Sequence, residues 1–274
     1  MRGMVGPACE VRFLGLFECR VDGVSIERWH AGRARSLFQY LLLNRGHLVT
    51  QARLYEVLWP ESEGARSSSL KVAVHALRKI LRDQGVPEHR ARVEFRDGGY
   101  LLHAPDAWID VDAFDEAIER GRRADLDQDA EAAVAAYRRA MDLYTGDFLA
   151  AEDAPWADEQ RQWCRSSALR ALERLVQEAV ERADDAAIVS WCRRIVAIDP
   201  YCETAYQALI ASHGRFGELA SVRSWHRICE RRLLGDLGIA PAEETRKLFS
   251  LAMNGKLRID SGMHLGRSLV TAAG

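Results

Sequence analysis

Basic side chains recur at helical spacing between residues 67 and 82. Lys71, His75, Arg78 and Arg82 repeat every three or four residues, so an α-helix would place them along one face. Cations on an exposed helix can bind phosphates, and those in its N-terminal half can reach base edges in the DNA major groove. A solvated basic face without a ligand is the alternative. The apolar residues beside the cations would form a buried stripe: Leu70, Ala73, Val74, Leu77, Ile80 and Leu81.

A glycine-containing hairpin is predicted shortly after this helix. Two short strands are expected on either side of Asp97-Gly98-Gly99, over Val93-Glu94-Phe95 and Tyr100-Leu101-Leu102, and glycine reaches the positive φ that a tight turn requires. A basic helix followed by such a hairpin is typical of a winged helix, in which the helix enters a groove and the hairpin contacts the neighbouring backbone.

The predicted DNA-binding residues divide by position. Residues in the N-terminal half of the helix should approach bases, whereas Arg78 and Arg82 more plausibly meet phosphates or a groove edge. Arg33 and Arg35 either contact phosphate or solvate the start of an earlier helix. The complete set is Arg33, Arg35, Ser67, Ser68, Ser69, Lys71, Val72, His75, Arg78, Lys79, Arg82, Arg96, Gly98 and Gly99.

The elements before this helix can be predicted from turn and capping signals. Residues 11–26 read as short strands turned at Asp22-Gly23, and an apolar helix follows over residues 36–43. Thr50 is a good N-cap for a helix over residues 51–58, which Trp59-Pro60 ends.

Beyond Pro105 the sequence becomes almost wholly helical. Candidate helices cover residues 111–123, 129–144, 156–183, 186–198, 202–215, 218–234 and 242–253. Trp191 and Trp225 open similar segments 34 residues apart, which is the tetratricopeptide period, and residues 137–144 look like an earlier copy. We therefore expect an α+β chain, with a winged helix-turn-helix domain followed by an all-α tetratricopeptide-like domain.

Composition and charge agree with two globular domains. The 274 residues are 48% hydrophobic and 28% charged, and neither a membrane span nor a signal peptide is evident, so a cytoplasmic location is expected. The first 105 residues carry 16 Lys and Arg against 11 Asp and Glu, whereas the remainder carries 22 against 29. This asymmetry suits a polyanion-binding module joined to a different one. The predicted division is a disordered N-terminus at 1–9, the winged helix at 10–105, the helical domain at 106–256 and a flexible tail at 257–274.

No pattern predicts an enzyme, a metal site or a cofactor. The sequence lacks a phosphate-binding Gly-x-x-x-x-Gly-Lys loop, a His-Glu-x-x-His motif and a Gly-x-Ser-x-Gly motif. The six cysteines include no Cys-x-x-Cys pair, and buried reduced thiols are expected even though His226 and Cys229 lie one helical turn apart.

The order of motifs resembles one family of bacterial regulators. Residues 77–81 (Leu-Arg-Lys-Ile-Leu) and 97–100 (Asp-Gly-Gly-Tyr) resemble OmpR-type winged helices. Residues 109–114, 144–149, 199–206 and 237–241, with Trp156, resemble landmarks of the bacterial transcriptional activation domain. Together they are similar to the Streptomyces antibiotic regulatory protein (SARP) family, which usually has tyrosine where this chain has His226. Larger members extend into an ATPase domain, so the chain is a small regulator or a fragment.

The resemblance implies a transcriptional activator of secondary-metabolite genes. Two copies would bind direct repeats in double-stranded DNA near a promoter −35 element and recruit RNA polymerase with its sigma factor. The loop before the basic helix would contact polymerase through Glu61, Ser62, Glu63 and Arg66.

A second class of function stays open. The tetratricopeptide groove could bind an effector, with DNA binding secondary. Four tryptophans could line such a groove, although core packing is the plainer explanation: Trp156, Trp163, Trp191 and Trp225.

Overall fold

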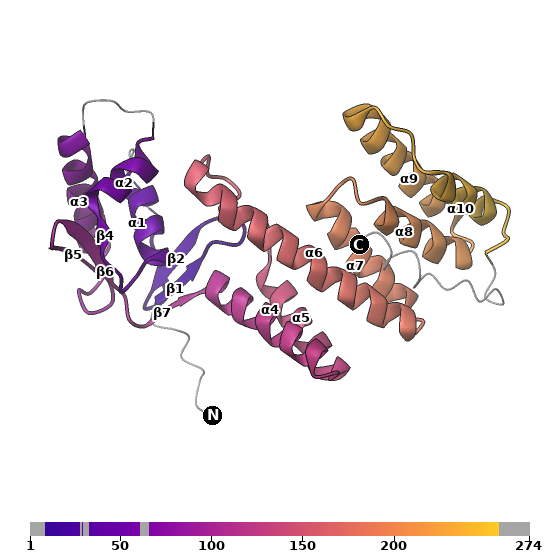
Figure 1. Cartoon of the computed structure of the whole chain (residues 1–274), viewed down its shortest axis with the longest axis horizontal. Coiled ribbons are helices and arrows are strands. Elements are labelled where there is room, and N and C mark those ends of the chain that lie inside the picture. The colour runs from indigo at the N-terminus through magenta and orange to yellow at the C-terminus, as the bar shows by residue number, and fades with distance from the viewer. Residues whose placement is uncertain (1–8, 28, 30–32, 61–65, 258–274) are drawn as a thin grey trace. The chain divides into compact units, whose positions relative to one another are not determined.

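The computed structural model describes residues 9–27, 29, 33–60 and 66–257 (Figure 1). The chain forms two compact units. The first contains Met1–Phe114 together with Leu143–Trp163, and the second contains Asp115–Asp142 together with Cys164–Gly274. Within the described residues, no helix has the length and apolar character needed to cross a membrane.

A four-stranded sheet opens the first unit. Its order is β3-β2-β1-β7, with β7 parallel to β1 and the other pairs antiparallel. The predicted strands before the helices are confirmed, and Asp22 and Gly23 form the turn with positive φ. The sequence analysis missed the last strand of this sheet, which follows the hairpin in the sequence and pairs with β1. The strands are β1 (Cys9–Arg12), β2 (Glu18–Val21), β3 (Val24–Ser25) and β7 (Ala107–Ile109).

Three helices lie between β3 and β7 in the chain: α1 (Ala34–Leu43), α2 (Gln51–Leu58) and α3 (Arg66–Asp83). The predicted cap is present, because Thr50 Oγ1 accepts a hydrogen bond from the Arg53 amide at 3.2 Å. The apolar stripe of α3 is buried as predicted, with Leu70 and Leu77 fully inaccessible. Both α1 and α2 pack against α3, so its opposite face is left to solvent.

The predicted hairpin forms part of a three-stranded sheet of order β4-β6-β5. Its strands are β4 (Val49–Thr50), β5 (Arg92–Arg96) and β6 (Gly99–His103). Asp97 and Gly98 both have positive φ, 47° and 75° respectively, and together form the turn. Gly99 has a different role: a Cβ there would lie 2.5 Å from the Val49 carbonyl oxygen, so glycine permits the close approach of β4.

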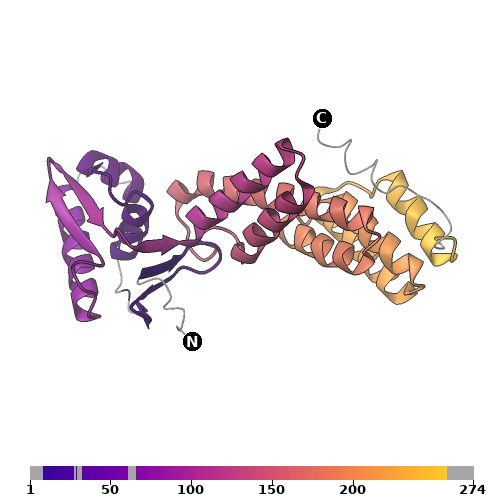
Figure 2. The same cartoon turned by 90° about the horizontal axis from the view of Figure 1, so that it is seen from below.

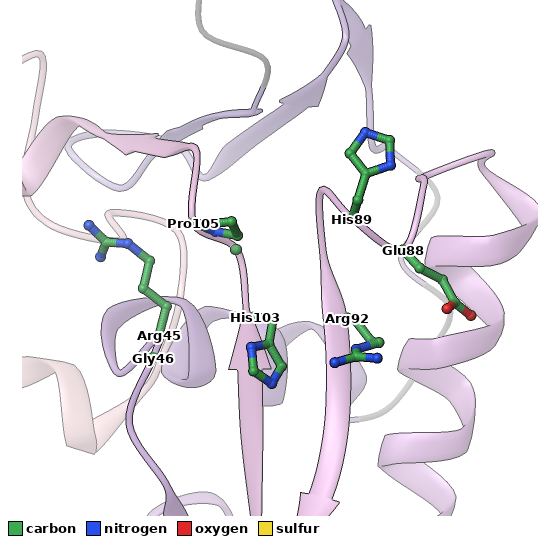
Figure 3. Close-up of a pocket in the computed structure, with 8 residues that line it drawn as sticks. Arg45, Gly46, Glu88, His89, Arg92, His103 and Pro105 are labelled. Carbon is green, nitrogen blue, oxygen red and sulfur yellow. The ribbon is translucent and has the colours of Figure 1, made fainter.

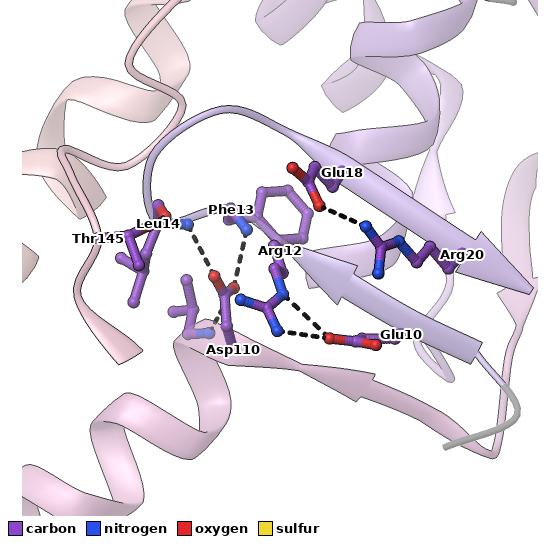
Figure 4. A network of polar contacts seen from close by, with 9 residues as sticks. Glu10, Arg12, Phe13, Leu14, Glu18, Arg20, Asp110 and Thr145 are labelled. Atoms are coloured by element: carbon purple, nitrogen blue, oxygen red, sulfur yellow. Dashed lines mark hydrogen bonds and ion pairs between the residues drawn. The ribbon is translucent and has the colours of Figure 1, made fainter. Parts of the chain in front are cut away.

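Asp110 joins the end of β1 to the start of α4 (Asp110–Leu126) (Figure 4). Its buried carboxylate accepts backbone hydrogen bonds from Phe13 at 2.8 Å and Leu14 at 2.9 Å. Burial raises the pKa of Asp110, while these amides and that of Val111 act in the opposite direction. The first unit therefore depends on residues beyond Pro105, where the sequence analysis placed the end of the winged-helix domain.

Residues 143–163 supply a further layer of the first unit. The Phe148 ring stacks on Phe13 with centroids 5.4 Å apart, and the Leu149 amide donates to the Phe13 carbonyl at 2.8 Å. Trp156 meets Tyr40 of α1 edge to face, with centroids 5.4 Å apart. The sequence analysis placed this segment in the helical domain. It could not foresee these contacts, because they join residues more than a hundred positions apart.

The second unit is helical, as predicted. Besides the later part of α4 it contains segments of α5 (Ala130–Leu143) and α6 (Asp158–Glu181), and then α7 (Asp185–Ile198), α8 (Glu203–Arg215), α9 (Leu219–Glu230) and α10 (Glu243–Met253). α8 packs against α7, α9 and α10. The predicted helix over 218–234 changes character partway, because a π-helical segment, Arg231–Asp236, follows α9. Figure 2 shows the same helices from a second direction.

Candidate nucleic-acid interface

The exposed face of α3 carries unpaired cations. α3 contains five Lys or Arg residues and a single Asp. Lys71, His75, Lys79 and Arg82 are exposed, and within the described chain no carboxylate pairs with the three permanently charged side chains. Val72 lies among them with 67% of its surface exposed. This face combines positive charge with one apolar side chain, which suits phosphates together with an apolar group such as the thymine methyl.

Arg78 joins α3 to the hairpin. Its Nε and Nη2 atoms donate to the Val93 carbonyl oxygen of β5, at 3.2 and 2.9 Å. The sequence analysis predicted a phosphate contact for Arg78. The geometry shows that part of its hydrogen-bonding capacity is already used to hold the helix and the hairpin together.

The hairpin tip is exposed and polar except for one aromatic residue. Arg96 and Asp97 pair at 3.2 Å, so the charge of Arg96 is partly neutralised. Phe95 is 53% exposed and contacts Tyr100, with ring centroids 5.1 Å apart. The sequence analysis did not include Phe95, because an apolar residue in a strand ordinarily predicts a buried position.

Two predicted contacts are engaged within the first unit, Gly99 by burial and Arg35 by an ion pair. Gly99 is buried against Val49, so it is not exposed for a contact with DNA. Arg35 is bound internally: Glu152 lies 3.0 Å away, and its guanidinium lies over the Phe17 ring at 5.4 Å. Arg35 thus has partners within the first unit, which neither the expected phosphate contact nor the expected solvation of the helix start included. Arg33, by contrast, is exposed immediately before α1.

The remaining predicted residues lie at the start of α3. Glu61, Ser62 and Glu63 fall outside the described residues. α3 begins at Arg66, so the three serines belong to its first turn rather than preceding it. Ser69 is half-buried, and the structure describes only the backbone of Arg66, Ser67 and Ser68.

A hollow of about 590 Å³ lies at the opposite end of the hairpin from its tip (Figure 3). Arg92 and His103 are cross-strand partners there, and both contact Glu94 Oε2 at 3.1 Å. Arg45, on another side of the hollow, pairs with Asp112. Because Arg92 and Arg45 already pair with carboxylates of this chain, the hollow differs from the exposed face of α3.

The described residues contain no group of three His, Cys, Asp or Glu arranged to hold a metal ion. His226 instead stacks on Phe249 of α10 at 4.0 Å, so it takes part in packing between α9 and α10. All six cysteines are free and five are buried. Burial raises the pKa of Cys229 to about 12, which keeps this thiol protonated and poorly suited as a ligand.

The four tryptophans are divided between the two units. Trp156 and Trp163 belong to the first unit, where Trp163 contacts Phe114 with ring centroids 6.3 Å apart. Trp191 and Trp225 belong to the second unit, where Trp225 packs against Tyr206 at 6.3 Å. Core packing accounts for these contacts.

Comparisons with known proteins identify both parts of the chain. Residues 109–250 match the bacterial transcriptional activator domain, and residues 30–102 match the C-terminal domain of transcriptional regulatory proteins. The transcriptional regulator RedD of Streptomyces coelicolor is 28% identical over 94% of this chain and 77% of its own length. The regulatory protein DnrI of Streptomyces peucetius is 26% identical over 96% of this chain and 97% of its own length.

Two further matches show how the shared region occurs in longer proteins. The regulatory protein AfsR of S. coelicolor is 27% identical over 78% of this chain, which covers only 21% of AfsR. The solved structure of Mycobacterium tuberculosis EmbR, in complex with a low-affinity phosphopeptide, superimposes with a TM-score of 0.64 at 19% identity. That alignment covers 97% of this chain and 69% of EmbR, and it supports the fold.

Proposed function

The chain belongs to the SARP family of transcriptional regulators, and from this premise we propose that it activates promoters by placing α3 in the DNA major groove. The hairpin β5–β6 would then lie along the neighbouring sugar-phosphate backbone or minor groove. The relatives are regulators rather than enzymes, so the activity sought is binding and recruitment.

The observation that carries this proposal is the unpaired basic face of α3. Lys71, Lys79 and Arg82 are exposed without carboxylate partners in the described chain, although most other arginines of the first unit form ion pairs. An unpaired surface cation retains its full charge for a phosphate, and releasing counterions from DNA supplies much of the binding free energy.

The finer features of the proposal follow from the family. Two copies would bind direct repeats near a −35 element, with their α3 helices on one face of DNA, and would recruit RNA polymerase with its sigma factor in the cytoplasm. Glu61, Ser62, Glu63 and Arg66 are the proposed polymerase contact. Secondary-metabolite genes are the proposed targets.

The first experiment is selection of binding sites from a random DNA pool with the full chain, followed by footprinting at two salt concentrations. Enriched direct repeats about one helical turn apart would support two copies on one face of DNA. Inverted repeats would contradict the tandem arrangement. Binding without enrichment would contradict sequence-specific activation and favour the effector-binding alternative.

Substitutions on α3 separate the roles of individual cations. Lys79→Ala should weaken binding to all sequences and reduce the salt slope by about one unit, as expected when one phosphate contact is lost. Lys71→Ala should change which bases are preferred. Lys247→Ala is the matched control, because this exposed lysine lies on α10 and pairs with Glu243. An unchanged salt slope for Lys79→Ala would remove Lys79 from the interface.

A further inference from the structure

The helices α4 and α5 run antiparallel, side by side (Figures 1 and 2). Gly121 permits close contact, because a Cβ there would lie 2.5 Å from the Tyr137 ring. The Tyr137 hydroxyl donates to Asp125 Oδ2 at 2.8 Å, and Arg174 donates to the other oxygen of that carboxylate at 3.1 Å. Both helices are therefore held in position before anything binds to them.

A hollow of about 560 Å³ lies on this pair, and small residues form its floor. Ala132, Ala135 and Ala136 recur on α5 at the spacing of one helix face, and Ala124 faces them from α4. Ala132 and Ala135 are exposed. Because a methyl group projects little, a third helix could approach the two backbones closely along this floor.

Three arginines border the hollow. Arg120 and Arg123 lie one turn apart on α4, and Arg139 lies on α5 one turn beyond Ala135 and Ala136. In the described chain no carboxylate pairs with any of the three, and Arg120 Nε donates to the Glu116 carbonyl oxygen of its own helix at 3.3 Å. They are free to bind carboxylates on another molecule.

Two aspartates make one end of the hollow negatively charged, whereas arginines border the rest of it. Asp127 and Asp129 lie in the connection between the helices, and Asp129 Oδ1 accepts a hydrogen bond from the Ala132 amide at 3.0 Å. A phosphate backbone would be repelled at this end, and an apolar floor contributes little to binding a polyanion. The N-terminus of a helix carries a partial positive charge. A helix bound in the hollow would therefore be favoured with its N-terminus near the aspartates and its acidic side chains near the arginines.

We propose that the α4–α5 hollow binds an acidic amphipathic helix of a partner protein. The small side chains of that helix would pack on the alanine floor, and its glutamates or aspartates would pair with Arg120, Arg123 and Arg139. This site is separate from α3 and the hairpin, and it does not depend on the proposed DNA binding.

The test is a fluorescence-anisotropy titration of the full chain, without DNA, against a labelled synthetic helix. The probe has alanine and leucine on one face and glutamate on the other, and an otherwise identical helix carrying lysine is its control. We expect the glutamate helix to bind and the lysine helix to bind at least tenfold more weakly. Equal affinity for the two helices, or no detectable binding of the glutamate helix, would overturn the proposal.

Variants locate the binding. Replacing Arg120, Arg123 and Arg139 together by Gln should weaken binding of the glutamate helix by about tenfold, since three exposed ion pairs, each of modest strength, are lost. Ala135→Trp should fill the hollow and abolish binding. The matched control is Arg122→Gln, because Arg122 is the neighbour of Arg123 but pairs with Glu119 at 2.7 Å.

Two results would assign these residues otherwise. If the triple Gln variant and Ala135→Trp both bind the glutamate helix as the unchanged protein does, the hollow is not the binding site. If the triple variant instead loses salt-dependent affinity for a random DNA duplex while helix binding is unchanged, the arginines contact DNA and the proposal is wrong. Circular dichroism melts establish that each variant is folded.

Discussion

Arg78 shows how a residue predicted to contact DNA can also stabilise the domain that binds it. Its two hydrogen bonds to the Val93 carbonyl connect α3 with β5. We predict that Arg78→Ala lowers the free energy of unfolding by about 1 kcal/mol, the usual contribution of such a bond. Lys79→Ala, on the same helix but with no ion-pair partner among the described residues, should change it by less than about 0.5 kcal/mol. Urea denaturation measures both, and equal effects would contradict a structural role for Arg78.

Asp110 makes stability depend on pH in a defined direction. Burial raises the pKa of its carboxyl above the ordinary value of 3.8, so between that value and the raised one the folded protein holds a proton that the unfolded chain has released. The contribution of Asp110 to the free energy of unfolding therefore falls as pH rises through this window and is constant above it.

The measurement is a comparison of the unchanged protein with Asp110→Asn across this window. We expect the free energy of unfolding of the unchanged protein, minus that of Asp110→Asn, to fall as pH rises through this window. Asn would also lose one of the two backbone bonds from Phe13 and Leu14, because its amide nitrogen cannot accept. Asp127→Asn, an exposed change, controls for net charge. A difference that is independent of pH would contradict the raised pKa.

At the scale of one element, the hairpin depends on two glycines for different reasons. Gly98 supplies a positive φ of 75° with open space around it, so Gly98→Ala should cost about 1–2 kcal/mol in backbone strain. Gly99→Ala should cost more, because its Cβ would meet the Val49 carbonyl at 2.5 Å and displace β4. Thermal unfolding ranks the two variants, and a more damaging Gly98→Ala would show that β4 moves easily.

At the scale of the whole molecule, the first unit is assembled from distant parts of the sequence. Phe148 is fully buried against Phe13, and Glu152 pairs with Arg35. We predict that a fragment of residues 1–105 unfolds at a lower denaturant concentration than the first unit in the full chain, because it lacks Asp110, Phe148 and Trp156. Amide hydrogen exchange in α1 measures the unfolding of this unit and, unlike tryptophan fluorescence, does not depend on Trp156, which the fragment lacks. Equal protection of α1 in the fragment and the full chain would contradict the prediction.

Local patterns in the sequence were sufficient for most elements and for the family. Apolar spacing identified α3 and its buried stripe, Thr50 identified the start of α2, and Asp97 with Gly98 identified the hairpin turn. Such signals act within about one turn of helix or one hairpin, so the sequence alone carries them. The cations of α3 were predicted as an exposed face for the same reason.

Only the tertiary structure decided which residues distant in the sequence contact one another. It showed that Arg35 is held by Glu152, that Gly99 is buried beneath β4, and that Asp110 and residues 143–163 complete the first unit. It also brought together the alanines and arginines of the α4–α5 hollow. These facts depend on contacts between chain segments that no local period encodes, because the spacing of residues along a chain does not specify which surfaces meet after folding.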